Sequence, residues 1–145
     1  VSTSQTAQGY LKGVGHTAVG QKDYEFAEMV LASALELDDG SVTDTHFIYN
    51  TLIDACYKQR NEREDAIEEC IEYCKKDIEI AQDFIDEFGE VPVIPSFKRL
   101  AIIYEKQKRY KDAIDVCNQA LDLGATDGTK GGFEGRKERL RNKTE

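Results

Sequence analysis

"FKRLAIIYEKQKRYKDAIDVCNQALDL", residues 97–123, is the stretch that decides the fold. Its small and apolar residues recur at intervals of three and four, which places them on one face of an α-helix. This pattern runs twice, and the polar segment KQKRY separates the two runs. Gly124 follows the second run and is a typical helix stop. The stretch therefore predicts two helices joined by a short turn, with the inner residues Leu100, Ala101, Tyr104, Ala113, Cys117 and Ala120.

The same spacing occurs twice more, earlier in the chain. The first copy lies between residues 11 and 34, where Gly20 is the expected stop of its first helix and QKDY its turn. The second copy lies between Tyr49 and Tyr73, with one extra residue in the turn. We therefore expect three helical hairpins: at about 4–38, at about 44–88 with an extended second helix, and at about 96–123. A linker at 89–95 and a tail with a capping helix at 124–145 complete the expected single domain over 1–145.

The second helix of the middle hairpin has two interpretations. No Gly or Pro interrupts the segment from Glu64 to Phe88, so one helix of about 25 residues fits it. Asp77 falls where the apolar period expects a hydrophobic residue, so a break near Asp77 followed by a second short helix is the alternative. The segment GEVPVIP then ends helical structure, because two prolines cannot continue a helix.

The fold class follows from the period and from the size of the inner residues. No segment shows the sustained alternation of a strand, which predicts an all-α fold of about six to seven helices packed as antiparallel hairpins. Small residues on each helix, such as Gly15 on the first and Ala27, Ala66 or Ala113 on the second, let two helix backbones approach closely. A hairpin cannot bury its apolar face alone, so the copies are expected to stack and share a core.

This pattern resembles the tetratricopeptide repeat. In the last copy Leu100, Ala101 and Tyr104, followed by the alanines and cysteine of the second helix, match the signature positions, with Phe97 at a position that favours a large aromatic residue. The resemblance implies a short right-handed solenoid of stacked hairpins. Ala27, Ala66 and Ala113 lie 39 and 47 residues apart, longer than the usual repeat of about 34 residues, so an irregular solenoid is expected.

The resemblance also implies a function, which is the binding of a peptide or a partner helix in the groove lined by the first helix of each hairpin. The outward positions of those helices are Lys12, His16, Asn50, Asp54, Tyr57, Lys98, Ile102 and Glu105. One version of the family clamps a carboxylate terminus; Lys12 and Arg99 fit that arrangement, whereas His16, Thr51 and Pro95 depart from it. Ordinary solvated helix faces are the alternative explanation of these positions.

Charge and composition exclude several function classes. The net charge of −9 argues against nucleic-acid binding, which needs clustered Lys and Arg. No apolar run is long enough to cross a bilayer and no leader pattern is visible, so we expect no membrane partner and a cytoplasmic location. Because the chain starts with Val1 rather than Met, we expect an excised domain or a processed chain. No phosphate loop or nucleophile pattern appears, so we expect neither an enzyme nor a cofactor.

The four cysteines, Cys56, Cys70, Cys74 and Cys117, all fall on apolar stripes without the two-residue spacing of zinc knuckles. We therefore expect buried thiols and no metal site. His16 is expected on a polar face and His46 in the first turn of its helix.

Two further hypotheses remain open. Residues 62–90 contain twelve acids and three bases, and residues 98–111 contain six bases and one acid. Pairing of these segments between chains would give a structural, self-assembling homo-oligomer. The chain would otherwise be a regulatory domain of a larger protein.

Overall fold

The computed structural model describes residues 5–144, which form eight α-helices and no strand. The all-α prediction is therefore confirmed for this part of the chain. The expected boundary at residue 4 and the end of the tail at residue 145 lie outside the described residues. The helices are α1 Ala7–Gly20, α2 Tyr24–Leu35, α3 Val42–Lys58, α4 Ala66–Glu79, α5 Ala81–Phe88, α6 Pro95–Lys106, α7 Tyr110–Asp122 and α8 Gly132–Thr144.

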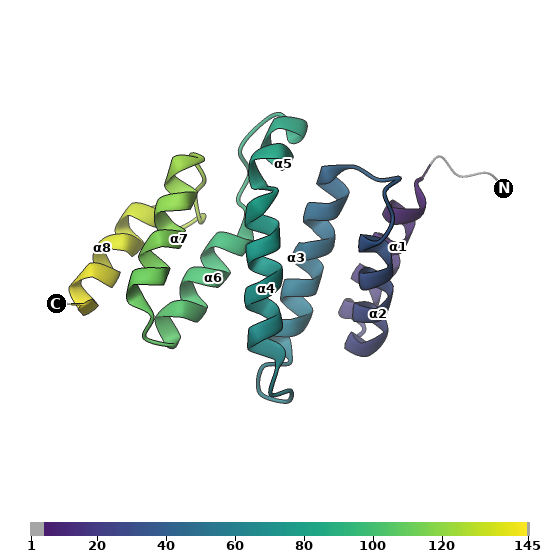
Figure 1. Cartoon of the computed structure of the whole chain (residues 1–145), viewed down its shortest axis with the longest axis horizontal. Helices are drawn as coiled ribbons and strands as arrows, with labels where there is room; N and C mark the ends of the chain where they lie inside the picture. The colour runs from purple at the N-terminus through teal and green to yellow at the C-terminus, as the bar shows by residue number, and fades with distance from the viewer. Residues whose placement is uncertain (1–4, 145) are drawn as a thin grey trace. The chain divides into compact units, whose positions relative to one another are not determined.

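The chain divides into two compact units, Val1–Ile80 and Ala81–Glu145, where the sequence predicted one domain. In the first unit α1 packs on α2, both pack on α3, and α3 packs on α4. In the second unit α6 packs on α7 and α7 packs on α8. Figure 1 shows α1 and α3 behind α2 and α4, so the first helices of the two hairpins share one side of the first unit.

A close contact between α1 and α2 lies at Gly15. A Cβ added at Gly15 would lie 2.4 Å from both Cγ and Cδ2 of Leu31 on α2. Leu31 is itself fully buried in a cluster with Ala34, Ile48 and Leu52, so its side chain has no free volume in which to move. The predicted alanines at the other close contacts are also buried, namely Ala27, Ala66, Ala101 and Ala113.

The turns of the first and last hairpins are closed by lysines rather than by glycine. Lys22 and Lys108 have φ angles of 62° and 61°, in the left-handed region where glycine is the usual residue. In each turn the next backbone N–H reaches back to the helix: Asp23 donates to the Ala18 carbonyl at 2.9 Å and Arg109 to the Tyr104 carbonyl at 2.8 Å. The expected stop at Gly20 is confirmed, because α1 ends at Gly20 and the turn to α2 begins at the next residue.

The middle hairpin contains the break that was one of the two alternatives. α4 begins at Ala66 and ends at Glu79, and Ile80 caps it with its N–H on the Asp77 carbonyl. α5 then runs over eight residues. The extended helix to Phe88 is therefore wrong, and the count of six to seven helices was too low because it merged α4 with α5.

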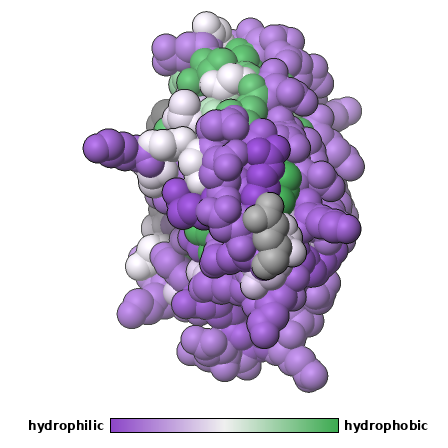
Figure 2. Space-filling model, turned by 90° about the vertical axis from the view of Figure 1, so that its left-hand side faces the viewer, coloured by the Kyte–Doolittle hydropathy of each residue, from purple (hydrophilic) through white to green (hydrophobic). Residues whose placement is uncertain are grey.

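The expected helix in the C-terminal tail is α8, which covers α7 in the second unit. Its residues Phe133 and Leu140 are buried. The Phe133 ring packs edge-on against Phe97 of α6, with 6.3 Å between the ring centroids. Burial alone would raise the pKa of Asp127, but hydrogen bonds from Thr129 and the Arg136 guanidinium hold that pKa below its usual range. The outer side of α8 carries mainly hydrophilic side chains, as Figure 2 shows.

The glycines of α1 provide a matched test of the close contact. Gly15→Ala should lower the free energy of unfolding by about 1–3 kcal/mol, because the new methyl group overpacks the buried Leu31 site. Gly13→Ala should raise it by about 0.5–1 kcal/mol, because that position has no neighbouring atom within 4 Å and gains helix propensity. Chemical denaturation of both variants measures the difference; equal effects of the two substitutions would contradict the packing described here.

Candidate functional site

A groove of about 610 Å³ lies between α1 and α3 in the first unit. All of its lining residues come from these two helices. Four of the predicted site residues, Lys12, His16, Asn50 and Asp54, are among them, so the fold brings residues of two separate helices together. The lining residues are Lys12, Gly13, His16, Val19, Gly20, Phe47, Asn50, Thr51, Asp54 and Lys58.

The helical repeat explains why these residues share one face. Lys12, His16 and Val19 are spaced at i, i+4 and i+7 along α1, and Phe47, Asn50 and Asp54 have the spacing i, i+3 and i+7 along α3. The apolar stripes of both helices are buried against α2 and α4, so the adjoining stripes face each other across the groove. The packing of α1 and α3 in the core therefore also fixes the positions of the groove residues.

Part of the groove lining is apolar and lacks side chains. Val19 is buried, whereas Phe47 is 39% exposed. A Cβ added at Gly13 or Gly20 would meet no other atom within 4 Å. The two glycines therefore leave room in the groove for a side chain of a binding partner.

The charges at the edge of the groove are already paired. Lys12 Nζ lies 2.6 Å from Asp44 Oδ1, and Lys58 Nζ lies 3.0 Å from Asp54 Oδ2. The hydrogen bond from Lys12 is the main reason that the pKa of Asp44 is lowered, and Ser41 adds to the effect through the capping box that starts α3. A carboxylate ligand would have to compete with Asp44 for Lys12.

A buried pair of side chains supports the groove from behind. His46 Nδ1 and Asp77 Oδ1 are 2.8 Å apart, and both side chains are excluded from solvent. Asn50 Nδ2 lies 3.2 Å from His46 Nε2. When Asn50 donates to Nε2, the ring hydrogen is on Nδ1 and is donated to Asp77. The Oδ1 atom of Asn50 is buried without a hydrogen-bond partner among the described residues.

Sequence reasoning placed His46 in the first turn of a helix and did not predict its partner. The signal was present in Asp77, which occupies the apolar stripe three residues after Cys74. A charged residue at a core position requires a buried partner. His46, three residues before the half-buried Tyr49 on the inner face of α3, is that partner.

The remaining predicted site residues lie elsewhere. Tyr57 is on α3 but outside the groove lining, and the Arg60 guanidinium lies 4.2 Å from its ring centroid. Lys98 and Ile102 are half-buried on α6 in the second unit. Glu105, also on α6, forms an ion pair with Lys143 of α8. None of these four lines the groove of the first unit.

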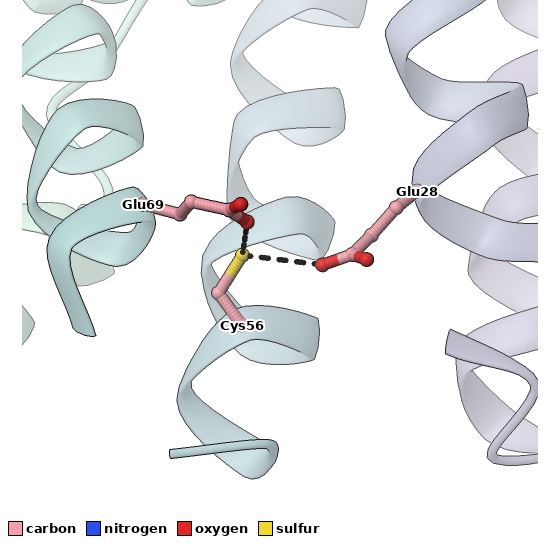
Figure 3. Close-up of side chains that lie close together, drawn as sticks. All are labelled: Glu28, Cys56 and Glu69. Carbon is pink, nitrogen blue, oxygen red and sulfur yellow. Dashed lines mark hydrogen bonds between the residues drawn. The ribbon is translucent and has the colours of Figure 1, made fainter. Parts of the chain in front are cut away.

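A second polar cluster joins three helices of the first unit, as Figure 3 shows. Cys56 Sγ of α3 lies 3.4 Å from Glu28 Oε1 of α2 and 3.5 Å from Glu69 Oε2 of α4. The ligand atoms of these residues lie within 4.8 Å of one another, which is close enough to share a cation. The cation present is Arg63, whose Nη2 lies 2.7 Å from Glu69 and 3.4 Å from Glu28. The Arg63 guanidinium thereby neutralises the two carboxylates of this cluster.

The expectation of buried thiols is confirmed, since all four cysteines are free and buried. Burial, together with Glu28 and Glu69, raises the pKa of Cys56 far above its usual range. Burial also raises the pKa of Cys117 to about 11. At neutral pH these two thiols are protonated and are therefore poor nucleophiles and poor metal ligands.

Removing the guanidinium tests whether this cluster fastens α2 and α4 to α3. We expect Arg63→Met to lower the free energy of unfolding by about 1–2 kcal/mol, because two carboxylates lose their shared donor. Arg63→Lys keeps the charge but not the two-pronged geometry, so about half of that loss is expected. Denaturant titration followed by circular dichroism gives both values. A Met variant as stable as the wild type would show that the cluster does not hold the helices together.

Comparison with known proteins leaves the family open. No helix in the described part of the chain has the length and apolar character that crossing a membrane requires. No family model matches the chain, and no solved structure matches it. The chain is similar to an uncharacterized protein of Aquifex aeolicus (strain VF5), with 27% identity over 126 residues that cover 83% of this chain. The match spans 59% of that protein's length.

Proposed function

We propose that the chain is a non-catalytic protein-interaction module that binds a peptide or a partner helix in the groove between α1 and α3. The proposal includes the resemblance to tetratricopeptide repeats, with the hairpins stacked as a short, irregular right-handed solenoid. The observation that carries it is the convergence of Lys12, His16, Asn50 and Asp54 on one groove of about 610 Å³. These residues come from the first helices of two successive hairpins, where this kind of repeat places its ligand.

The chemistry of the groove favours a particular class of ligand. Its lining combines Val19, Phe47 and two glycines with a few polar and charged side chains. An apolar lining with a few oriented polar groups is typical of ligand sites. Because Lys12 and Lys58 are already paired with carboxylates, the proposed ligand is recognised by an apolar side chain inserted beside Phe47 rather than by its charge.

Asn50 is the proposed polar anchor for the ligand. Its amide nitrogen is held by His46, while its Oδ1 has no partner. Because Oδ1 is buried, a ligand N–H reaches it only when binding turns the Asn50 amide toward the groove. The hydrogen bond then formed would relieve the free-energy penalty of a buried acceptor without a partner.

Two observations support a non-catalytic role. The imidazole of His46 is already engaged by Asp77 and Asn50 inside the core. The pKa values of Cys56 and Cys117 are raised, mainly by burial, which disfavours a thiolate nucleophile.

The test uses a ligand selected on the protein itself. Peptides would be selected on the wild-type chain from a random display library, and one synthesised peptide would be titrated by calorimetry. Gly20→Leu fills the groove from a position with open space around it, so we expect the dissociation constant to rise at least about tenfold. Asn50→Ala should weaken binding by a similar factor because the ligand loses its anchor.

The matched control is Gln119→Leu, which adds the same side chain at an exposed position of α7 in the second unit. This variant should bind the peptide with the wild-type constant. If the selected peptides bind Gly20→Leu as tightly as they bind the wild type, the groove between α1 and α3 is not the binding site.

A further inference from the structure

The first hairpin carries an exposed apolar surface on the side of α1 away from the groove. Tyr10 is 59% exposed, Met29 is 60% exposed and Phe26 is 41% exposed. A hollow of about 520 Å³ lies beside them between α1 and α2. We call this surface the front face; the hollow is lined by Gln5, Tyr10, Gly13, Val14, Thr17, Ala18, Gln21, Asp23 and Phe26.

The internal repeat shows what this surface is built for. A shift of 38 residues, which superimposes the stripes of α1 and α3, matches Tyr10 with Ile48, Val14 with Leu52 and Thr17 with Ala55. In the second hairpin Ile48, Leu52 and Ala55 are fully buried. They pack against the first hairpin, in clusters with Leu31 and Ala34 or with Ala18 and Ala27.

The equivalent positions of the first hairpin therefore form a stacking surface without a partner in the described structure. Tyr10 and Thr17 are exposed, and Val14 is only half-buried. Three large exposed hydrophobic side chains on one hairpin mark an interaction surface.

The charge of the front face indicates the kind of partner. The chain carries a net charge of −9, yet Asp23 is the one charged residue in the lining of the hollow. Asp23 is also engaged locally, where it accepts from the backbone N–H of Phe26 and caps α2. Two acidic chains meet with the least repulsion on such a neutral surface, whereas a charged peptide or a nucleic acid would find nothing to pair with.

If the partner is a second copy of this chain, its surfaces restrict how the two copies can be arranged. A head-to-tail contact would place the front face on the far end of the last hairpin of another copy. That end is covered by α8, which buries Phe133 and Leu140 and turns a hydrophilic side outward (Figure 2). A contact of front face with front face about a two-fold axis needs no second surface, since each copy supplies the same residues.

We propose that the front face is the interface of a symmetric homodimer, formed with a second copy of this chain through Tyr10, Phe26 and Met29. The groove between α1 and α3 lies on the other side of α1 and stays open in this dimer. The inference is independent of the proposed peptide binding. It also differs from assembly through the acidic and basic segments, because the hollow at this contact is lined by a single charged residue, Asp23.

Sedimentation equilibrium from about 5 to about 500 µM protein measures the dimer. The expected mass of the wild type rises with concentration from 16.4 kDa toward twice that value. The double variant Tyr10→Ser with Met29→Ser should weaken the dimer constant at least about tenfold. The control, Phe88→Ser with Val93→Ser, removes comparably exposed apolar side chains from the second unit and should leave the constant unchanged. A wild type that stays monomeric at the highest concentration overturns the proposal, as does a dimer that only the control weakens.

A spin label gives a second readout that does not depend on weakening the dimer. Because the four native cysteines are buried, Met29→Cys introduces a thiol that can be labelled selectively. In a mixture of labelled chains and ¹⁵N-enriched unlabelled chains, the label should broaden the amide signals of Tyr10, Val14 and Phe26 of the other copy. Broadening on α7 or α8 instead would show a head-to-tail contact and would contradict the two-fold arrangement.

Discussion

The contact of Gly15 with Leu31 is the constraint on which the first unit depends. With no Cβ at Gly15, the backbone of α1 approaches α2 closely enough for the Leu31 side chain to lie against it. This approach buries Leu31 together with Ile48 and Leu52 of α3, so that one glycine sets the spacing of three helices. Lys12 and His16, on the neighbouring stripe of α1, are thereby directed toward α3 and form one wall of the groove.

Apolar packing alone would leave the helices free to choose among similar arrangements, and polar side chains in the interior restrict that choice. Asp77 of α4 has one buried partner, His46 of α3, which fixes the position of α4 along α3. Arg63 performs a related role at the other end of these helices by holding Glu28 of α2 and Glu69 of α4. The first of these interactions also orients Asn50, so the support of the fold and the proposed anchor in the groove are physically the same hydrogen-bonded chain.

The parts of the structure that the sequence could predict are those determined by local period. Inner residues such as Leu100, Ala101 and Cys117 recur at helical intervals, and all three are buried. Contacts between residues that are far apart in the sequence could not be predicted. His46 and Asp77 are separated by 31 residues, and Glu105 and Lys143, which form an ion pair, by 38 residues. The turn after Gly20 was predicted, but the left-handed conformation of Lys22 within it was not, because glycine is the usual left-handed residue and lysine carries no such signal. The exposed Tyr10 and Phe26 also could not be distinguished from core residues, since an apolar residue in a periodic pattern is expected to be buried.

For the candidate site, four of the residues predicted from the sequence line one groove between α1 and α3, and the side chains that support this groove were not predicted. Lys12, His16, Asn50 and Asp54 line one groove because outward positions on neighbouring helices must face the same side. The most direct test of the central claim, that α1 and α3 present a binding groove, is an amide chemical-shift titration of the ¹⁵N-labelled chain with a selected peptide. We predict that the largest chemical-shift changes occur between Lys12 and Gly20 and between Phe47 and Lys58. If the largest changes occurred on α2 or on the helices of the second unit, the peptide would not bind in the groove between α1 and α3.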